Sequence, residues 1–594
     1  MSYRAPLRDL GFTLKHVLGL EDLQATGAYP DLDADVVDAV LEAAGQVSEG
    51  TLAPLNVIGD RAGSRLEGDG VIPAPGFGEA YRTFIEGGWM GLAAPTAHGG
   101  QGLPKALELA AFETVHSANM AFGLCPMLSL AAIEALEAHG TEAQKTTYLE
   151  KLISGEWTGA MVLTEPNAGS DLGALTATAT PKGDGTYSLN GQKIYITWGD
   201  HDMTDNIVHM VLARLPDAPL GPKGISLFLA PKYLLNADGS RGERNAFRPV
   251  GVEHKLGIHA SPTCVMAYEG ATAELVGLPN EGLAHMFTMM NAARVAVGVE
   301  GVGIAERAYQ NALAYATDRR QGRSVWTGEA SAPILDHPDV RRTLSVMKAR
   351  IAAGRAICLA TGMAADLARS SADPDVARQW KGREDLLTPI AKAWSTDMGV
   401  EVASMGIQIH GGMGFIEETG AAQYYRDARI APIYEGTNGI QAMDLVGRKL
   451  SQDGGASARL LIEEMKTVLT PLAALYDGKP VERMANALSA VEDATLWLLD
   501  RKAAEDGTAD VLTAADAYLK LMGDVIGGWF LARGALAAQT LKANGEGDAD
   551  WLDGRIALYE VYAANVLGHV SSRLAAIGQG GDLLLRMTPA VLAP

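Results

Sequence analysis

The spacing of apolar residues changes twice along the chain. From about residue 32 to 157, apolar residues recur at i, i+3 and i+4 in stretches such as VVDAVLEAAGQV and LELAAFETV. Between about 160 and 278, short alternating runs such as SLNGQKIYIT and GISLFLA are separated by Gly, Pro, Asn and Asp. Helical spacing returns at 281 and continues to about 450. We therefore expect a helical domain, a β domain and a second helical domain, in that order.

Further amphipathic segments, such as LLIEEMKTVLTPL, follow the turn-like sequence SQDGGAS and carry more acidic than basic residues. They predict a helical extension that packs on the core or at a subunit interface. The expected parts are 1–159, 160–279, 280–450 and 456–594.

Charge and composition exclude several classes of function. The net charge of −22 disfavours nucleic acid and anionic membrane surfaces as partners. Three widely spaced cysteines and unpaired histidines predict neither a disulfide framework nor a metal site. The N-terminus has no secretory signal pattern, and the longest uncharged run, 117–133, falls short of the ~18–20 residues of a membrane span. A cytoplasmic protein is expected.

Two segments carry candidate chemistry, MVLTEPNAGSD at 161–171 and APIYEGTNGIQ at 431–441. Taken alone, the first is an ordinary turn-rich loop and Glu435 is a surface carboxylate before a glycine turn. Together with GGWMGLAAPTAHGGQG at 87–102 and QIHGGMGF at 408–415, they resemble the acyl-CoA dehydrogenase family across roughly residues 85–450. The resemblance implies an α+β fold with a helical N-terminal domain, a middle β domain, a C-terminal helical bundle and a helical extension.

The resemblance also implies an FAD-dependent enzyme that desaturates an acyl-CoA between its α and β carbons. Electron-transfer flavoprotein is the expected electron acceptor. Glu435 is the expected base, because one branch of the family carries its base at the position of Ala293, which has no carboxylate. A partly desolvated carboxylate has a raised pKa and can take the α-proton of a thioester. Gly436 would let the thioester carbonyl approach backbone donors.

Further site residues are assigned by the same resemblance. Those expected to contact FAD are Met161, Leu163, Thr164, Gly169, Ser170, Tyr195, Ile196, Thr197, Arg319, Gln408, Gly412 and Thr437. Those expected to contact acyl-CoA are Ser170, Arg294 and Gly436. Tyr195 stands where the family usually has Trp, and Asn291 replaces an acidic residue. The family's arginine at position 319 reaches the FAD of a neighbouring subunit, which implies a homodimer or a tetramer.

Several alternatives remain open. With its C-terminal extension, the chain resembles the long members of the family that act on 3-methylmercaptopropionyl-CoA. This resemblance implies 3-methylmercaptopropionyl-CoA as substrate and 3-methylthioacryloyl-CoA as product, in dimethylsulfoniopropionate degradation. Another short-, medium- or long-chain acyl-CoA is possible, because scattered apolar side chains build the acyl pocket. An acyl-CoA oxidase would pass electrons to oxygen instead. A DNA-associated flavoprotein of the same fold would need a basic surface, which the net charge opposes.

Overall fold

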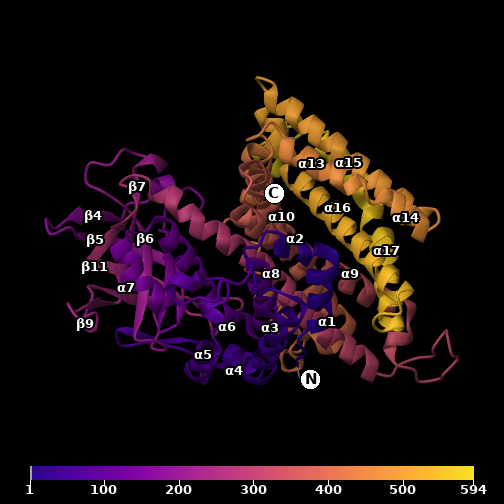
Figure 1. The fold of residues 1–594 in the computed structure, drawn as a ribbon, viewed down its shortest axis with the longest axis horizontal. Helices are drawn as coiled ribbons and strands as arrows, with labels where there is room; N and C mark the ends of the chain where they lie inside the picture. Colours follow the sequence, from indigo (N-terminus) through magenta and orange to yellow (C-terminus); the bar gives the residue numbers. More distant parts are fainter. Residues whose placement is uncertain (1–2) are drawn as a thin grey trace.

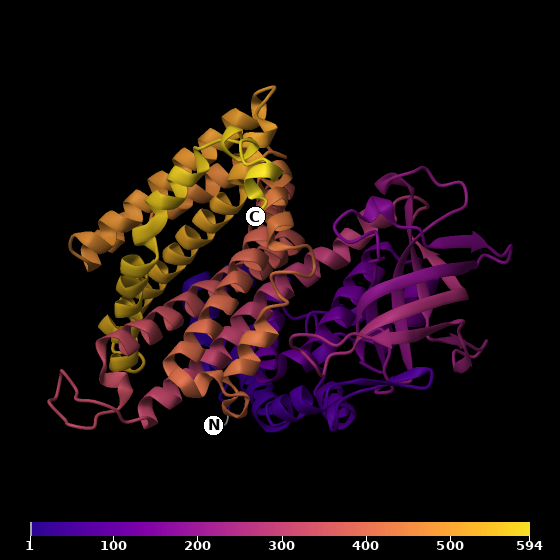
Figure 2. The same cartoon turned by 180° about the vertical axis from the view of Figure 1, so that it is seen from behind.

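The computed structural model describes residues 3–594. The β domain lies on one side of a bundle of long helices, and the C-terminal helices lie on the other (Figures 1 and 2). The two signature segments, 161–171 and 431–441, meet at one cavity between the β domain and the bundle.

The N-terminal region contains α3 (Ala34–Val47), α5 (Phe77–Glu86), α6 (Lys105–His139) and α7 (Glu142–Ile153). Asn119 interrupts α6 with non-helical angles (φ −158°, ψ 90°), and its side chain accepts a hydrogen bond from the Phe122 N–H at 3.1 Å. The uncharged run at 117–133 therefore lies in a kinked and fully buried part of α6. One short hairpin interrupts the helices of this region. β1 (Arg65–Glu67) and β2 (Gly70–Ile72) form a hairpin, because Gly68 (φ 60°) allows a tight turn.

Two described helices, α6 and α9 (Pro338–Ser370), are long and apolar enough to cross a membrane. Most of the apolar stretch of each is buried inside the protein, where it packs against other helices. Both have the burial of core helices in a folded domain.

The β domain is one curved seven-stranded sheet in which β7 pairs with both β6 and β11. Most pairs are antiparallel, while β6 runs parallel to both β3 and β4. Its strands are β3 (Trp157–Val162), β4 (Thr178–Pro181), β5 (Tyr187–Thr197), β6 (Asn206–Arg214), β7 (Ile225–Pro231), β10 (Phe247–Val252) and β11 (Thr263–Val276). A separate two-stranded hairpin is formed by β8 (Tyr233–Leu235) and β9 (Arg241–Arg244). The end of β3, the loop after it and the end of β5 face α8 (Gly282–Asp318) across a cavity.

The central bundle consists mainly of α8 (Gly282–Asp318), α9 (Pro338–Ser370) and α10 (Pro374–His410), with α11 (Ala421–Ala428) and α12 (Asn438–Asp444) after it. Small residues bring α8 and α10 together. A Cβ on Gly298 would lie 2.6 Å from the Ala391 carbonyl oxygen, and one on Gly301 would lie 2.5 Å from that of Ser395. Larger residues would force these helices apart.

The extension comprises α13 (Ala456–Lys466), α14 (Leu469–Leu475), α15 (Lys479–Ala503), α16 (Thr508–Ala543), α17 (Ala549–Asn565) and shorter helices to the C-terminus. It shares one apolar core with α9 and α10, and α16 packs against α9, α10 and α12. The carboxylate of Asp524 accepts hydrogen bonds from Trp394 Nε1 at 2.9 Å and Arg573 Nε at 2.6 Å. The extension therefore packs on the core of its own chain, on the side of the bundle away from the β domain (Figure 2).

Candidate active site

A cavity of about 310 Å³ lies between the β domain, α8 and the loop that precedes α12. Eleven residues expected from the sequence to form the site line it, although they come from four separate segments. They are Met161, Leu163, Thr164, Gly169, Ser170, Tyr195, Ile196, Thr197, Arg294, Glu435 and Gly436. The fold thus brings the two signature segments together across one space.

A buried ion pair holds the first signature loop in place. Glu165 accepts hydrogen bonds from the N–H groups of Thr176 at 2.7 Å and Ala177 at 3.0 Å. Lys193 lies 2.9 Å from Glu165 and also donates to the Leu163 carbonyl at 2.8 Å. Sequence reasoning missed both residues, although a charged residue within an alternating strand such as GQKIYIT is a usable signal for a buried pair. Through these contacts the loop presents its glycine and hydroxyl groups to the cavity.

The strand end of β5 adds an exposed aromatic ring. Tyr195 has φ 60° and its side chain is 59% exposed, whereas the neighbouring Ile196 is buried in the sheet core. A positive φ is uncommon for a residue with a Cβ and marks a position that the surrounding fold has to hold. An added Cβ on Gly169 would have no heavy atom within 4 Å, so the backbone there is open to a ligand. The site therefore offers apolar side chains, hydroxyl groups, open backbone and an aromatic ring. This combination fits a flavin ring.

Glu435 occupies a strained loop on the opposite wall. Its φ is 55° and that of Gly436 is 80°. The buried side-chain amide of Gln441 donates to the carbonyls of Glu435 at 3.2 Å and Gly436 at 3.3 Å, which holds this conformation. Burial raises the pKa of Glu435 to about 7, against the opposing charges of Arg294 and Lys392. The carboxyl group is therefore suited to exchange a proton near neutral pH.

Two further ionisable residues lie behind this loop, and sequence reasoning missed them. Glu300 on α8 is fully buried and accepts a hydrogen bond from the Tyr434 hydroxyl. Burial raises the pKa of Glu300 to about 8. Lys392 on α10 is also fully buried, and burial lowers its pKa to about 7. Both interrupt apolar helical stretches, VAVGVEGVG and PIAKAW, which was the available signal.

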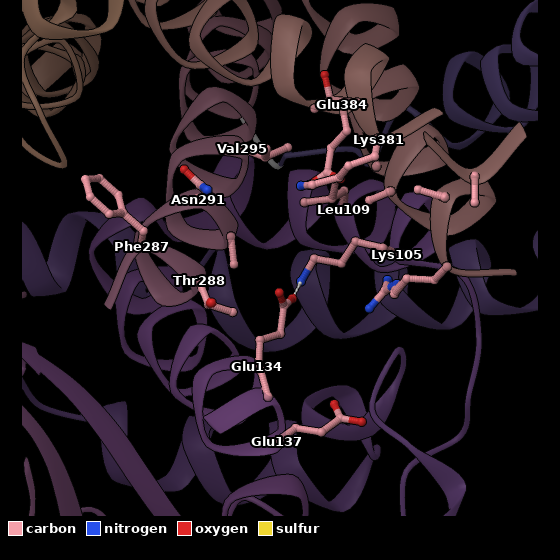
Figure 3. A pocket seen from close by; sticks show the side chains of 18 of the residues that line it. Lys105, Leu109, Glu134, Glu137, Phe287, Thr288, Asn291, Val295, Lys381 and Glu384 are labelled. Atoms are coloured by element: carbon pink, nitrogen blue, oxygen red, sulfur yellow. Dashed lines mark hydrogen bonds and ion pairs between the residues drawn. The ribbon is translucent and has the colours of Figure 1, made fainter. Parts of the chain in front are cut away.

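A second cavity, of about 860 Å³, opens beside the first between α6, α8, α9 and α10, and Phe287 lines both (Figure 3). Lys105 lies 2.6 Å from both Glu108 and Glu134. Asn291 accepts a hydrogen bond from Arg294 Nη1 at 3.2 Å. The positive and negative side chains that line this second cavity largely offset one another, so no wall of the cavity is strongly charged.

Four expected FAD contacts lie outside the cavity of the single chain. Arg319, Gln408 and Gly412 are exposed, at the C-terminal ends of α8 and α10. Thr437 caps α12 by accepting a hydrogen bond from the Ile440 N–H at 3.2 Å. Contact of these residues with a cofactor stays a prediction. Within residues 3–594, no group of His, Cys, Asp and Glu side chains is arranged to hold a metal ion.

Family models match most of the chain. The N-terminal, middle and C-terminal domains of acyl-CoA dehydrogenases match residues 66–156, 160–270 and 280–450. The extension matches a domain described as acetyl-CoA dehydrogenase C-terminal like, over residues 461–588.

Individual relatives cover the whole length. The chain is 47% identical to a 3-methylmercaptopropionyl-CoA dehydrogenase of Ruegeria pomeroyi, over 98% of this chain and 99% of the relative. It is 34% identical to a broad-specificity linear acyl-CoA dehydrogenase of Mycobacterium tuberculosis, over 96% of each. The structure of a Bacillus anthracis acyl-CoA dehydrogenase complexed with FAD has the same fold, with a TM-score of 0.74 at 21% identity over 94% of this chain and 91% of that one. The chain belongs to the acyl-CoA dehydrogenase family, whose members use FAD to oxidise acyl-CoA thioesters.

Proposed function

We propose that Glu435 is the catalytic base of this dehydrogenase and that its substrate is 3-methylmercaptopropionyl-CoA, converted to 3-methylthioacryloyl-CoA. One observation carries the assignment of the base: a partly buried carboxyl group with a pKa near neutral faces the expected flavin-binding residues across a single cavity. Residue 293 is an alanine, so α8 supplies no carboxylate at the alternative position.

In the proposed reaction, Glu435 accepts the α-proton of the thioester as the α,β double bond forms. Bound FAD supplies the acceptor for the hydride that leaves the β-carbon. The strained loop places Glu435 at the cavity, and the backbone of Gly436 lines the same cavity, where the thioester carbonyl would approach it. Exclusion of water strengthens each of these electrostatic contacts.

Arg294 supports the substrate in this proposal. Its side chain is buried, lies 3.7 Å from Asp444 and donates to Asn291. Its Nε is buried and has no hydrogen-bond partner among residues 3–594. A buried donor without a partner is costly, and a ligand oxygen would satisfy it. We infer that Arg294 serves the acyl-CoA near its thioester, with the neighbouring cavity at Phe287 available to another part of the substrate.

The choice of acyl group rests on the 47% identical relative, since other full-length relatives are named for linear acyl-CoA and butyryl-CoA. Anaerobic bleaching of the flavin absorbance with 3-methylmercaptopropionyl-, butyryl- and octanoyl-CoA tests it. We expect the first to bleach the flavin with a second-order rate constant at least about tenfold above the others, which corresponds to about 1.4 kcal/mol. Equal rates would remove the substrate assignment and leave the reaction class. Rapid hydrogen peroxide release in air would indicate an oxidase.

We also propose electron-transfer flavoprotein as the electron acceptor and a homodimer as the assembly. Arg319, Gln408 and Gly412 are exposed and would reach a neighbour's cofactor. The large apolar side chain of Phe415, next to this segment, is 86% exposed. Sedimentation equilibrium should give at least twice the 62.5 kDa chain mass. A monomer that retains FAD would contradict the shared site.

A further inference from the structure

A buried set of ionisable groups surrounds the Glu435 loop from behind. On one flank, the Tyr434 hydroxyl donates to Glu300 of α8. On the other, the ammonium of Lys392 on α10 donates to Asn438 Oδ1 at 2.9 Å. Both Glu300 and Lys392 are fully buried; the charge of Lys392 lowers the pKa of Glu435, and the charge of Glu435 helps to raise the pKa of Glu300. Tyr434, the residue before the proposed base, is therefore hydrogen-bonded to buried Glu300, and Asn438, at the start of α12, is hydrogen-bonded to buried Lys392.

Asn438 fixes the position of the ammonium. Its amide nitrogen donates to Asp397 Oδ1 at 2.8 Å and to the Ala393 carbonyl at 3.0 Å. Its amide oxygen is thereby turned toward Lys392. Asp397 lies in turn 3.9 Å from Lys520 of α16. The extension thus supports, through α10, the arrangement that holds Lys392 beside the loop.

The charges around Glu435 come from every element packed against it. Those that act on it or on its immediate neighbours are Arg294 and Glu300 of α8, Lys392 and Asp397 of α10, Tyr434 of its own loop, Asp444 of α12, Arg448 after it, and Asp516 and Lys520 of α16. Arg294 is 3.7 Å from Asp444, so part of its charge is offset. Within residues 3–594, Lys392 has no carboxylate within ion-pair distance of 4.0 Å, and its hydrogen bond goes to a neutral amide.

A carboxyl group that is desolvated and close to a second carboxyl group resists ionisation. A base must be ionised to take a proton, so a compensating cation is needed nearby. We propose that Lys392, held by Asn438, is a positioning residue whose ammonium keeps Glu435 ionised for abstraction of the α-proton. This inference rests on the proposed role of Glu435. It adds a residue that does not touch the substrate and acts only through the base.

The sign of the effect follows from the charge. Loss of the Lys392 cation removes a stabilising interaction with the Glu435 carboxylate, which raises the pKa of Glu435 further. Proton abstraction then requires a higher pH. A variant without the Lys392 cation should therefore abstract the proton much more slowly than the wild type below neutral pH. In alkaline solution the difference in rate should be small, because Glu435 is ionised in both proteins and because Lys392, with its pKa lowered to about 7, carries less charge.

Exchange at the α-carbon measures the base separately from the redox step. Methylthioacetyl-CoA has sulfur in the β position, so it can lose an α-proton but has no β-hydride to transfer. The FAD-loaded enzyme is incubated with it in D₂O, and deuterium uptake is followed by mass spectrometry between pH 5 and 9. In the wild type, uptake should rise about tenfold per pH unit up to about pH 7 and then level off, because a single base becomes ionised.

We call the rising part of this pH profile the limb. We expect Lys392→Met to move the limb to higher pH by about one unit, so that exchange is about tenfold slower than in the wild type at pH 6 and about equal at pH 9. Lys392→Arg should restore most of the wild-type limb. Lys449→Met is the matched control, because Lys449 is equally a buried lysine but pairs with Asp385 at 2.7 Å. It should leave the limb in place even if it lowers stability.

An unshifted limb in Lys392→Met, in protein that retains FAD and its thermal midpoint, would overturn the proposal. If Lys392→Met does not fold, Asn438→Ala replaces it as the test and should shift the limb in the same direction, because the ammonium loses its fixed partner. An unshifted limb there would count equally against the proposal. Glu435→Gln is measured alongside. Persistent exchange in that variant would remove Glu435 as the base, a failure distinct from that of Lys392.

Discussion

Glu435→Gln is expected to keep its FAD and to lose flavin bleaching by the acyl-CoA substrate by about 10²–10⁴-fold, the contribution typical of a positioned general base. Glutamine has nearly the shape of glutamate, so the strained loop that Gln441 holds should persist. An amide cannot accept the α-proton. Anaerobic stopped-flow measurement of the flavin absorbance, with FAD content determined from the same spectra, provides the test.

Glu418→Gln is the control for this result, because Glu418 is an exposed carboxylate of the same C-terminal domain and lies outside the cavity. It should bleach at the wild-type rate. Bleaching by Glu435→Gln within threefold of the wild type would show that another group takes the proton. Loss of FAD from the variant would instead assign Glu435 a structural role.

Arg355→Met is expected to destabilise the folded enzyme by about 3–5 kcal/mol, the range for removal of one partner from a buried ionic cluster. Arg355 on α9 lies 2.5 Å from Glu113 and 3.0 Å from Glu306, and all three are almost fully buried. Asp9 lies 3.6 Å from the same guanidinium and also pairs with Arg555 of α17 at 3.2 Å. The substitution leaves three carboxylates with fewer cations. The first thermal unfolding transition should therefore fall by several degrees.

Arg342→Met on the same helix serves as the comparison. Arg342 and its partner Asp339 are both exposed, at 2.7 Å. An exposed pair contributes about 0–1 kcal/mol, so the transition should move little. Equal shifts in the two variants would show that the buried cluster contributes no more than a surface pair. A lower transition temperature in Arg355→Met alone would show that the buried cluster stabilises the packing of the N-terminal segment, α6, α8, α9 and the extension against one another.

The residues that the sequence predicted for the active site are those that lie within contiguous motifs. The segments 161–171 and 431–441 are contiguous, so the family resemblance could assign their residues from neighbouring positions, although turn chemistry alone would not have distinguished them from ordinary loops. Glu300 and Lys392 were missed because each lies in the middle of a long helix, far along the chain from Glu435. Only the close approach of α8 and α10 at Gly298 and Gly301 places both behind the base.

By itself, the sequence determined the order of helical, β and helical parts, since periodicity is a local property of the chain. It also determined the family and the identity of the candidate base. Tertiary structure decided which charges surround that base, because burial and neighbouring charge, which set a pKa, depend on contacts between distant segments. It also decided the place of the extension, whose apolar faces could have packed on another subunit but are buried against α9, α10 and α12.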